Sequence, residues 1–256
     1  MLIPSRSCST LPLLIIDHIS STSVTFKIVP SIFRICLSPE HGKISLPIIC
    51  SICPLLHIYY QTMATPPPNR LSTISARALH LVNTLNLEYL PYESGYVGLL
   101  GSSALRITTT PGSNLAAQSH NYYMLTSALP INYLHWLEPD DTHILIEGGP
   151  VEYYIFHPAT DSSLPKAERI VLGRDFEKGQ TAIISVPGGC WKALRLCEGV
   201  DFALMGNVLS PEFTGDRVKI GFWNEEERKE WKGRYAGREE WVTEETLEEL
   251  VGEVGC

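Results

Sequence analysis

Short runs of β-branched and aromatic residues alternate with turn residues through the middle of the chain, from Tyr89 to Ile220. Gly, Pro, Asn and Asp separate the runs, most clearly at Gly148-Gly149-Pro150 and Pro187-Gly188-Gly189. The runs are Ala104–Thr109, Asn121–Leu125, Tyr133–Trp136, His143–Ile146, Val151–His157, Glu168–Leu172, Thr181–Val186, Cys190–Leu196 and Phe202–Val208. Short strands at regular intervals with turn signals predict an all-β sandwich or closed barrel.

A helical pattern precedes these runs. Apolar residues recur at helical spacing and predict a helix from Ser75 to Leu85, packed on the strands that follow. Ser72 or Thr73 is the expected N-cap, because a short hydroxyl side chain can accept a hydrogen bond from the first turn. The apolar positions are Ile74, Ala78, Leu81, Val82 and Leu85.

The pattern changes again from Gly221 onwards. Residues 225–230 are nearly all charged, and Thr243 precedes a short stretch with a narrow apolar edge, which predicts a capped helix. Aromatic side chains are unfavourable in water, so we expect this acidic tail, residues 221–256, to pack on the barrel or on a partner subunit. These aromatic residues are Trp223, Trp231, Tyr235 and Trp241.

Residues 1–62 differ from the rest in composition. They hold few charges and no amphipathic period that lasts beyond a turn or two. We expect an extension that is disordered or translated only in the gene model, followed by a barrel domain at 63–220. The alternative is a real targeting or membrane-anchoring segment.

Charge and cysteine content narrow the possible functions. The net charge of -8 argues against a nucleic-acid partner, and no phosphate-binding glycine motif is present. Of seven cysteines, four precede Met63, and the other three do not form a disulfide framework. We therefore expect a cytoplasmic protein that does not associate with membranes. Cys190 has no close sequence partner that would activate it, so a nucleophilic role is not predicted.

Two short motifs carry a resemblance to a known superfamily. His135, Asp141 and Gly148 have the spacing of the first cupin motif, with Leu137 in place of its second histidine. The stretch from Pro187 to Lys192 is similar to the second motif, with Lys192 in place of its histidine. The chain therefore resembles the cupins, which implies a double-stranded β-helix (a jelly-roll barrel) and a homodimer.

Further segments resemble the type-five cupins, a family of unknown function. They are Glu93–Tyr96, Ser119–Leu125, Gly148–Pro150, Leu172–Asp175 and Gly206–Phe213. The chain departs from that family at Gly98 and Leu99, where an Arg-Glu pair is usual, and at His143 and Ile144, where a Trp-His pair is usual.

The resemblance implies a site inside the barrel. Its expected ligand-binding residues are Glu93, His135, Asp141, His143, Trp191 and Lys192. At the four positions where most cupins bind a metal, this chain has His135, Leu137, Asp141 and Lys192. Leucine cannot ligate a cation and an ammonium group repels one, so we expect no metal and no cofactor.

Three functions remain open at this stage. The first is a small-molecule-binding protein for a small polar or anionic ligand. The second is a metal-free isomerase or epimerase, as the resemblance implies, with His135 as general base and Tyr123, Tyr153 or Tyr96 as the candidate acid. The third is a metal-dependent oxygenase, which Leu137 and Lys192 disfavour. For Trp191, a place in the core is favoured over a role as a stacking surface for the ligand.

Lys192 and Asp141 are also expected to pair inside the barrel, because a desolvated charge must be paired or neutralised. The alternative is a motif shifted by one residue, with Lys192 in water and Trp191 in the core.

Overall fold

The computed structural model describes residues 14–20, 23–28, 31–36, 74–109 and 112–252. Contacts divide the chain into two units, Met1–Cys53 and Pro54–Cys256. In the first unit, β1 (Leu14–Ser20), β2 (Ser23–Ile28) and β3 (Ser31–Cys36) form an antiparallel sheet in sequence order. The sequence pattern did not predict these strands. The expected N-caps Ser72 and Thr73 lie outside the described residues.

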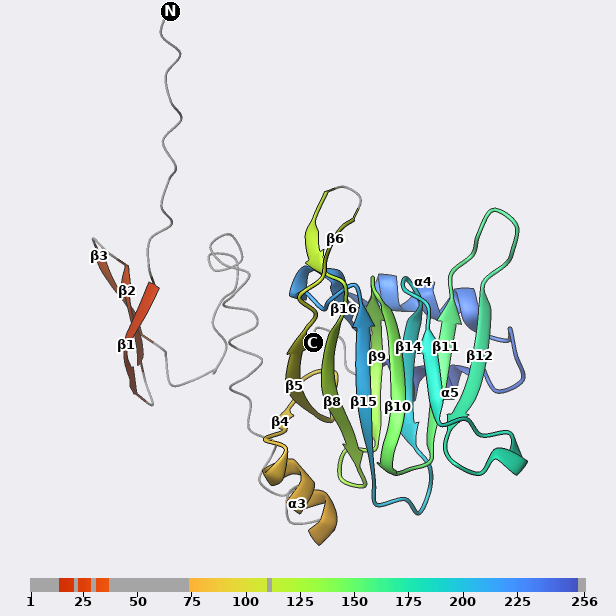
Figure 1. The fold of residues 1–256 in the computed structure, drawn as a ribbon. Helices are drawn as coiled ribbons and strands as arrows, with labels where there is room; N and C mark the ends of the chain where they lie inside the picture. Colours follow the sequence, from red (N-terminus) through yellow and green to blue (C-terminus); the bar gives the residue numbers. More distant parts are fainter. Residues whose placement is uncertain (1–13, 21–22, 29–30, 37–73, 110–111, 253–256) are drawn as a thin grey trace, which may run out of the picture. The chain divides into compact units, whose positions relative to one another are not determined.

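Two antiparallel sheets make up the second unit (Figure 1). The six-stranded sheet has the order β13-β10-β15-β8-β5-β4, and the five-stranded sheet has the order β12-β11-β14-β9-β16. The strands of the first are β13 (Ile183–Val186), β10 (Asp140–Gly148), β15 (Phe202–Ser210), β8 (Ser119–Thr126), β5 (Tyr96–Ser102) and β4 (Glu88–Tyr89). Those of the second are β12 (Lys166–Leu172), β11 (Val151–His157), β14 (Trp191–Leu196), β9 (Ile131–Leu137) and β16 (Val218–Ile220). β6 (Arg106–Thr108) and β7 (Asn114–Ala116) form a separate hairpin. This is the all-β jelly-roll architecture that the sequence predicts.

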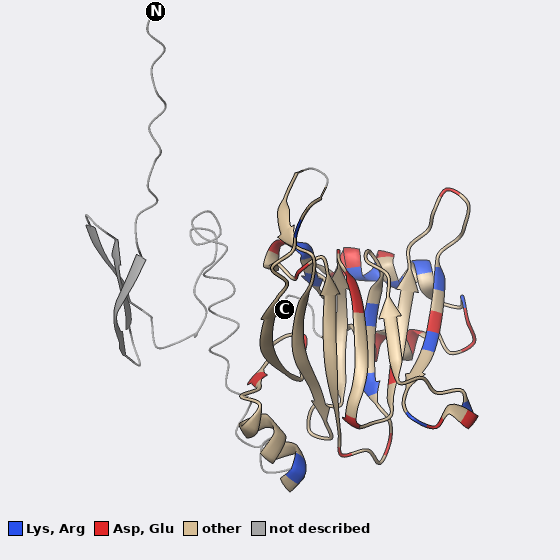
Figure 2. Ribbon diagram, viewed as in Figure 1, with Lys and Arg blue, Asp and Glu red and all other residues tan. Residues whose placement is uncertain are grey.

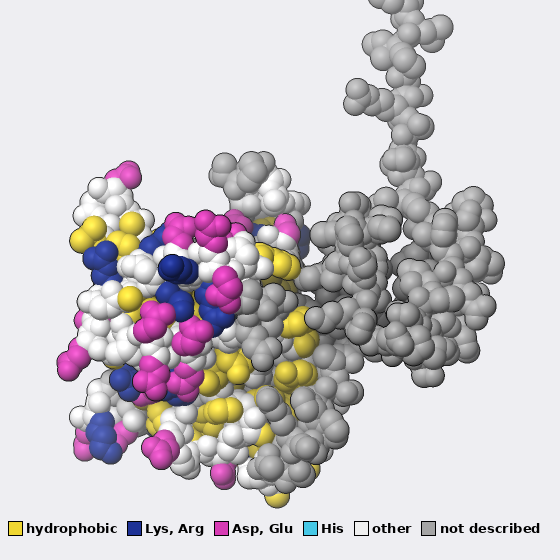
Figure 3. Space-filling view, turned by 180° about the vertical axis from the view of Figure 1, so that it is seen from behind, with side chains coloured by type: hydrophobic (Ala, Val, Ile, Leu, Met, Phe, Trp, Pro, Cys, Tyr) yellow, Lys and Arg dark blue, Asp and Glu magenta, His cyan; other side chains and the backbone are white. Residues whose placement is uncertain are grey.

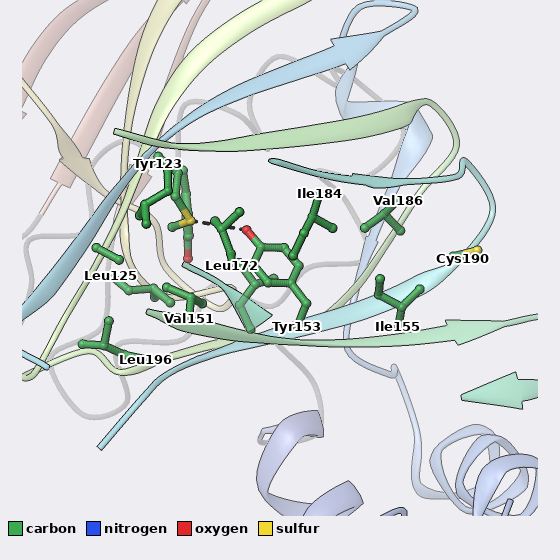
Figure 4. Close-up of a cluster of buried hydrophobic side chains, with 14 residues drawn as sticks. Tyr123, Leu125, Val151, Tyr153, Ile155, Leu172, Ile184, Val186, Cys190 and Leu196 are labelled. Carbon is green, nitrogen blue, oxygen red and sulfur yellow. Dashed lines mark hydrogen bonds between the residues drawn. The ribbon is translucent and has the colours of Figure 1, made fainter. Parts of the chain in front are cut away.

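The core lies between the two sheets. Alternate residues of each strand point inward, as the period of a β-strand requires. On β11, for example, Tyr153 and Ile155 belong to this core, whereas Tyr154 and Phe156 belong to a second cluster on the outer face. Figure 4 shows the inner cluster, with Tyr153 directed toward the opposite sheet.

A short helix covers the outer face of the six-stranded sheet. α3 (Ala76–Thr84) buries Ala78, Leu81 and Val82 against residues of that sheet such as Met124. The predicted helix is confirmed, but its N-cap is Ser75, whose side chain accepts a hydrogen bond from the backbone N–H of Ala78 at 3.2 Å.

The acidic tail packs on the outer face of the five-stranded sheet. α4 (Glu225–Tyr235) and α5 (Glu244–Val251) contribute Trp231, Tyr235 and Leu247 to the outer cluster. Their outer surface mixes acidic and basic side chains (Figure 3), which also alternate along the ribbon (Figure 2). The predicted cap of the last helix is confirmed, since the Thr243 hydroxyl accepts from the Thr246 N–H at 3.1 Å. Within the described ranges, none of the helices combines the length and apolar character that crossing a bilayer requires.

Candidate functional site

Strand pairing brings the expected site residues together from both sheets. Asp141 and His143 are two residues apart on β10, so their side chains share its inner face. His135 on β9 pairs directly with Lys192 on β14 in the facing sheet. All four residues are buried, with exposures of 2–3%.

Lys192 and Asp141 form an ion pair across the interior. The ammonium Nζ donates a hydrogen bond to Oδ2 of the carboxylate, and both side chains are almost fully enclosed. The predicted pair is confirmed, and the alternative of a motif shifted by one residue is wrong. A buried pair of this kind satisfies two charges that would be costly alone.

His143 extends this pair into a chain of polar groups. Its Nε2 lies 3.3 Å from Oδ2 of Asp141, and its Nδ1 forms a hydrogen bond with the hydroxyl of Tyr153 on β11. The Tyr153 oxygen is also 3.3 Å from the thioether sulfur of Met205 (Figure 4).

Electrostatics keep the acid charged and the phenol neutral. Burial would raise the pKa of Asp141, but the charges and hydrogen bonds of His143 and Lys192 outweigh it and hold the pKa well below its usual range. Burial, together with the charge of Asp141, raises the pKa of Tyr153 well above the usual value for tyrosine. The interior therefore contains an ionised pair beside a protonated phenol.

A second polar group surrounds His135. Its Nδ1 lies 2.9 Å from the backbone carbonyl of Tyr133, which identifies Nδ1 as the donor nitrogen. Its Nε2 faces Oε1 of Glu93 at 3.6 Å. Asn132 fixes Glu93 by donating to its backbone carbonyl at 3.0 Å and to Oε1 at 3.2 Å.

The loop that presents Glu93 has an unusual backbone. Tyr92, Ser94 and Gly95 all have positive φ angles, of 68°, 73° and 83°. Such conformations are costly for residues other than glycine and persist only where the surroundings hold them. The Tyr123 hydroxyl does so here by donating to the Ser94 carbonyl at 2.7 Å.

Two hydrogen-bond acceptors face each other at this site, Nε2 of His135 and Oε1 of Glu93. Burial lowers the pKa of His135, the nearby charge of Glu93 opposes this, and the charge of Lys192 lowers it further. The net result favours a neutral ring with a lone pair on Nε2. That lone pair points toward a carboxylate oxygen at a distance too long for a hydrogen bond. An ammonium group placed between them would satisfy both, and a hydroxyl group would satisfy one.

The remaining expected residues have other surroundings. The Tyr123 ring stacks near His143, at 6.2 Å between centroids, but its hydroxyl bonds to the Glu93 loop. Trp191 points to the outer face of β14, where its ring lies 5.1 Å from that of Phe222 and packs near Trp231. The structure thus brings five of the six expected ligand-binding residues toward one interior and places Trp191 under the tail.

The residues at the cupin ligand positions do not fit a metal ion. Lys192 brings a positive charge to the carboxylate that would bind the cation, and Leu137 has no donor atom. Among the described residues, no group of three or more His, Cys, Asp or Glu side chains is arranged to hold a metal.

Asn132 is the site residue that the sequence did not reveal. It is 1% exposed and lies near the start of β9, just before the predicted run Tyr133–Trp136 and separated from His135 by a register shift in the pairing with β14. An asparagine in an apolar run is a weak signal, because its partner Glu93 is 39 residues away along the chain.

The fold and this interior define a cupin. The family model described as Cupin superfamily (DUF985) matches residues 79–220, and the chain belongs to this family. Two solved structures share the fold. A hypothetical protein from Leishmania major is 22% identical with a TM-score of 0.54, over 66% of this chain and 97% of that one. A protein from Shewanella oneidensis is 19% identical with a TM-score of 0.54, over 68% and 96%. The search of curated proteins finds no match.

Proposed function

We propose that the protein binds a small polar molecule at His135 and Glu93, inside the jelly roll and without a catalytic metal. The observation that carries this proposal is the pair of facing acceptors, Nε2 of His135 and Oε1 of Glu93, at 3.6 Å. A ligand ammonium group can donate to both at once, and a ligand hydroxyl can donate to either one. In this proposal, the inner residues orient the donor group of a ligand, where most cupins bind a metal.

The surroundings support a polar ligand of small size. The side chain of Glu93 is 17% exposed, whereas that of His135 is 3% exposed, so the pair leads from solvent into the interior. Lys192 lies opposite His135 and provides a cation within reach of the same space. This combination favours a molecule with both a hydroxyl and an anionic group, such as a hydroxy acid.

The test is a binding screen with matched variants. The full chain is screened against small hydroxy acids, polyols and amino alcohols by native mass spectrometry and thermal shift. A ligand of this site should lose at least about tenfold in affinity in His135→Phe and Glu93→Gln, because the first removes an acceptor and the second removes the negative charge that strengthens the other hydrogen bond. Glu177→Gln, at a 3-10 turn remote in sequence, is the control. Unchanged affinity in both site variants would exclude this location.

A metal-free isomerase or epimerase is the second candidate. The observation that favours it is the neutral His135 with its lone pair directed inward, since a general base must be unprotonated. Tyr123 and Tyr153 stay protonated because burial raises the pKa of each, so either can serve as the acid. Incubation of identified ligands in deuterated water distinguishes the two functions. An enzyme exchanges a carbon-bound proton of its ligand, and a binding protein does not.

A further inference from the structure

A second chemical group lies apart from the His135 site. Cys190, at the start of β14, has its sulfur 3.4 Å from Nδ1 of His157 at the end of β11. Nε2 of the same histidine lies 3.1 Å from Oε2 of Glu168 on the neighbouring strand β12. A thiol, an imidazole and a carboxylate therefore form a continuous hydrogen-bonded series, the arrangement that activates a nucleophile.

The partners on each side fix the proton positions. Glu168 accepts from Nε2–H, so the lone pair of a neutral His157 is on Nδ1, which faces the thiol. Lys166 lies 3.6 Å from the same carboxylate oxygen, and Tyr235 donates to the backbone carbonyl of His157 at 3.0 Å. The tail therefore holds the strand end that carries the histidine.

The series also runs from the core to solvent. Cys190 is 5% exposed and belongs to the inner cluster, where Figure 4 shows it at one end. The side chains of His157 and Glu168 are 27% and 36% exposed. Burial raises the pKa of the Cys190 thiol, which the charge of Lys192 only partly offsets. The resting thiol is thus protonated, and its reactivity depends on the base beside it.

The surroundings restrict the reagent. Backbone N–H groups near the thiol are already bonded: that of Gly188 to Asp140 at 2.8 Å, and that of Gly189 to the Leu137 carbonyl at 2.8 Å. They are not available to stabilise the oxyanion that acyl transfer requires. A nearly enclosed thiol also admits only a small neutral molecule. Both features favour a hydroperoxide over an ester or amide.

We propose that Cys190, His157 and Glu168 form a peroxide-reactive thiol site, at which Cys190 is oxidised to a sulfenic acid. His157 takes the thiol proton at Nδ1 while the sulfur attacks one peroxide oxygen. The S–O bond forms and the O–O bond breaks. The leaving oxygen then receives the proton from His157 and departs as water or an alcohol. Sulfur is oxidised by two electrons and the hydroperoxide is reduced by two.

Cys197 provides an internal control in the same strand region. It is more exposed than Cys190, burial likewise raises its pKa, and its charged neighbours are Glu152 and Arg169. Trypsin separates the two thiols, because Lys178 and Lys192 bound a peptide with Cys190 alone, and Arg195 and Arg217 bound one with Cys197 alone. The full-length protein is treated with hydrogen peroxide and dimedone, and both peptides are quantified over time by mass spectrometry.

We expect Cys190 to be labelled at least about tenfold faster than Cys197, since general base catalysis typically contributes about 10²–10⁴-fold. In His157→Gln that advantage should disappear, while labelling of Cys197 stays unchanged. Glu168→Gln, a substitution at a half-exposed position, should slow Cys190 by a smaller factor. Equal labelling of the two thiols in the native protein would overturn the proposal, and so would an unchanged Cys190 rate in both variants. If Cys197 is labelled faster in His157→Gln than in the native protein, that substitution has loosened the packing. The rate of Cys190 labelling in Glu168→Gln then decides whether the proposal holds.

Discussion

Lys192 on β14 and Asp141 on β10 belong to different sheets, and their side chains meet in an ion pair in the interior. Both are 2% exposed, so removal of one partner leaves an uncompensated buried charge. We expect Lys192→Met and Asp141→Asn each to lower the free energy of unfolding by about 3–5 kcal/mol. The double variant should lose less than the sum, which chemical denaturation of all four proteins will measure.

Lys178→Met is the matched control for that cycle. Its amine pairs with Asp175 at 2.7 Å, but the lysine side chain is 78% exposed. A surface pair of this kind contributes little, and the loss should stay below about 0.5 kcal/mol. Additive, small effects of Lys192→Met and Asp141→Asn would show that the pair is not buried in solution.

His135 should make stability depend on pH in the mildly acidic range. Because burial lowers its pKa in the folded state, the unfolded chain binds its proton more readily. The contribution of His135 is therefore present above the unfolded pKa, about 6.5, and is lost as pH falls from that value toward the folded pKa. Denaturation at a series of pH values should show this decline, and His135→Gln should flatten it.

Asp141 contributes in a separate, more acidic range. Its folded pKa is depressed, so its stabilising effect is present above the ordinary value of about 3.9 and is lost only below it. Asp141→Asn should accordingly leave the decline near pH 6 in place. If Asp141→Asn removed that decline and His135→Gln did not, the assignment of His135 would be wrong.

Restoring histidines should create a metal site. The purified protein is expected to contain no stoichiometric transition metal, whereas Leu137→His combined with Lys192→His supplies four possible ligands together with His135 and Asp141. Elemental analysis and zinc titration will compare the two proteins. Near-stoichiometric metal in the natural protein, lost in His135→Ala, would contradict the metal-free proposal.

Trp231 should anchor the tail. It is 4% exposed and packs edge-on against Phe156, with 4.9 Å between the ring centroids. Trp231→Ala is expected to cost about 3–5 kcal/mol, because it opens a cavity between α4 and the sheet. Trp223→Ala, at a residue 72% exposed, should cost far less. Equal melting temperatures for the two variants would show that the tail does not stabilise the sheet.

Strand periodicity predicted most of the jelly roll, because turns and β-branched runs are local signals. β11 has the predicted bounds, Val151–His157. β5 was missed, since Gly98 and Gly101 weaken its pattern and Leu99 is 84% exposed. α4 was visible only as a charge run, because its buried face includes the charged residue Arg228 beside Trp231 and Tyr235.

The candidate site likewise has one part that the sequence predicted and one part that it could not. The Lys192–Asp141 pair could be predicted, since the resemblance to the two cupin motifs implied that both residues point to one centre. The Cys190–His157 contact joins residues 33 positions apart, and pattern alone does not show which strands neighbour one another.

The ion pair also limits how β14 can align with its neighbours. Successive residues of a strand face opposite sides, so a slip by one position would exchange Lys192 with Trp191. The ammonium group would then enter the aromatic cluster under the tail, and the indole would displace it beside Asp141. Such a slip would therefore cost stability on both faces of β14, through an unpaired buried charge on each. The pair therefore favours one register of β14 over the others that apolar side chains alone would tolerate.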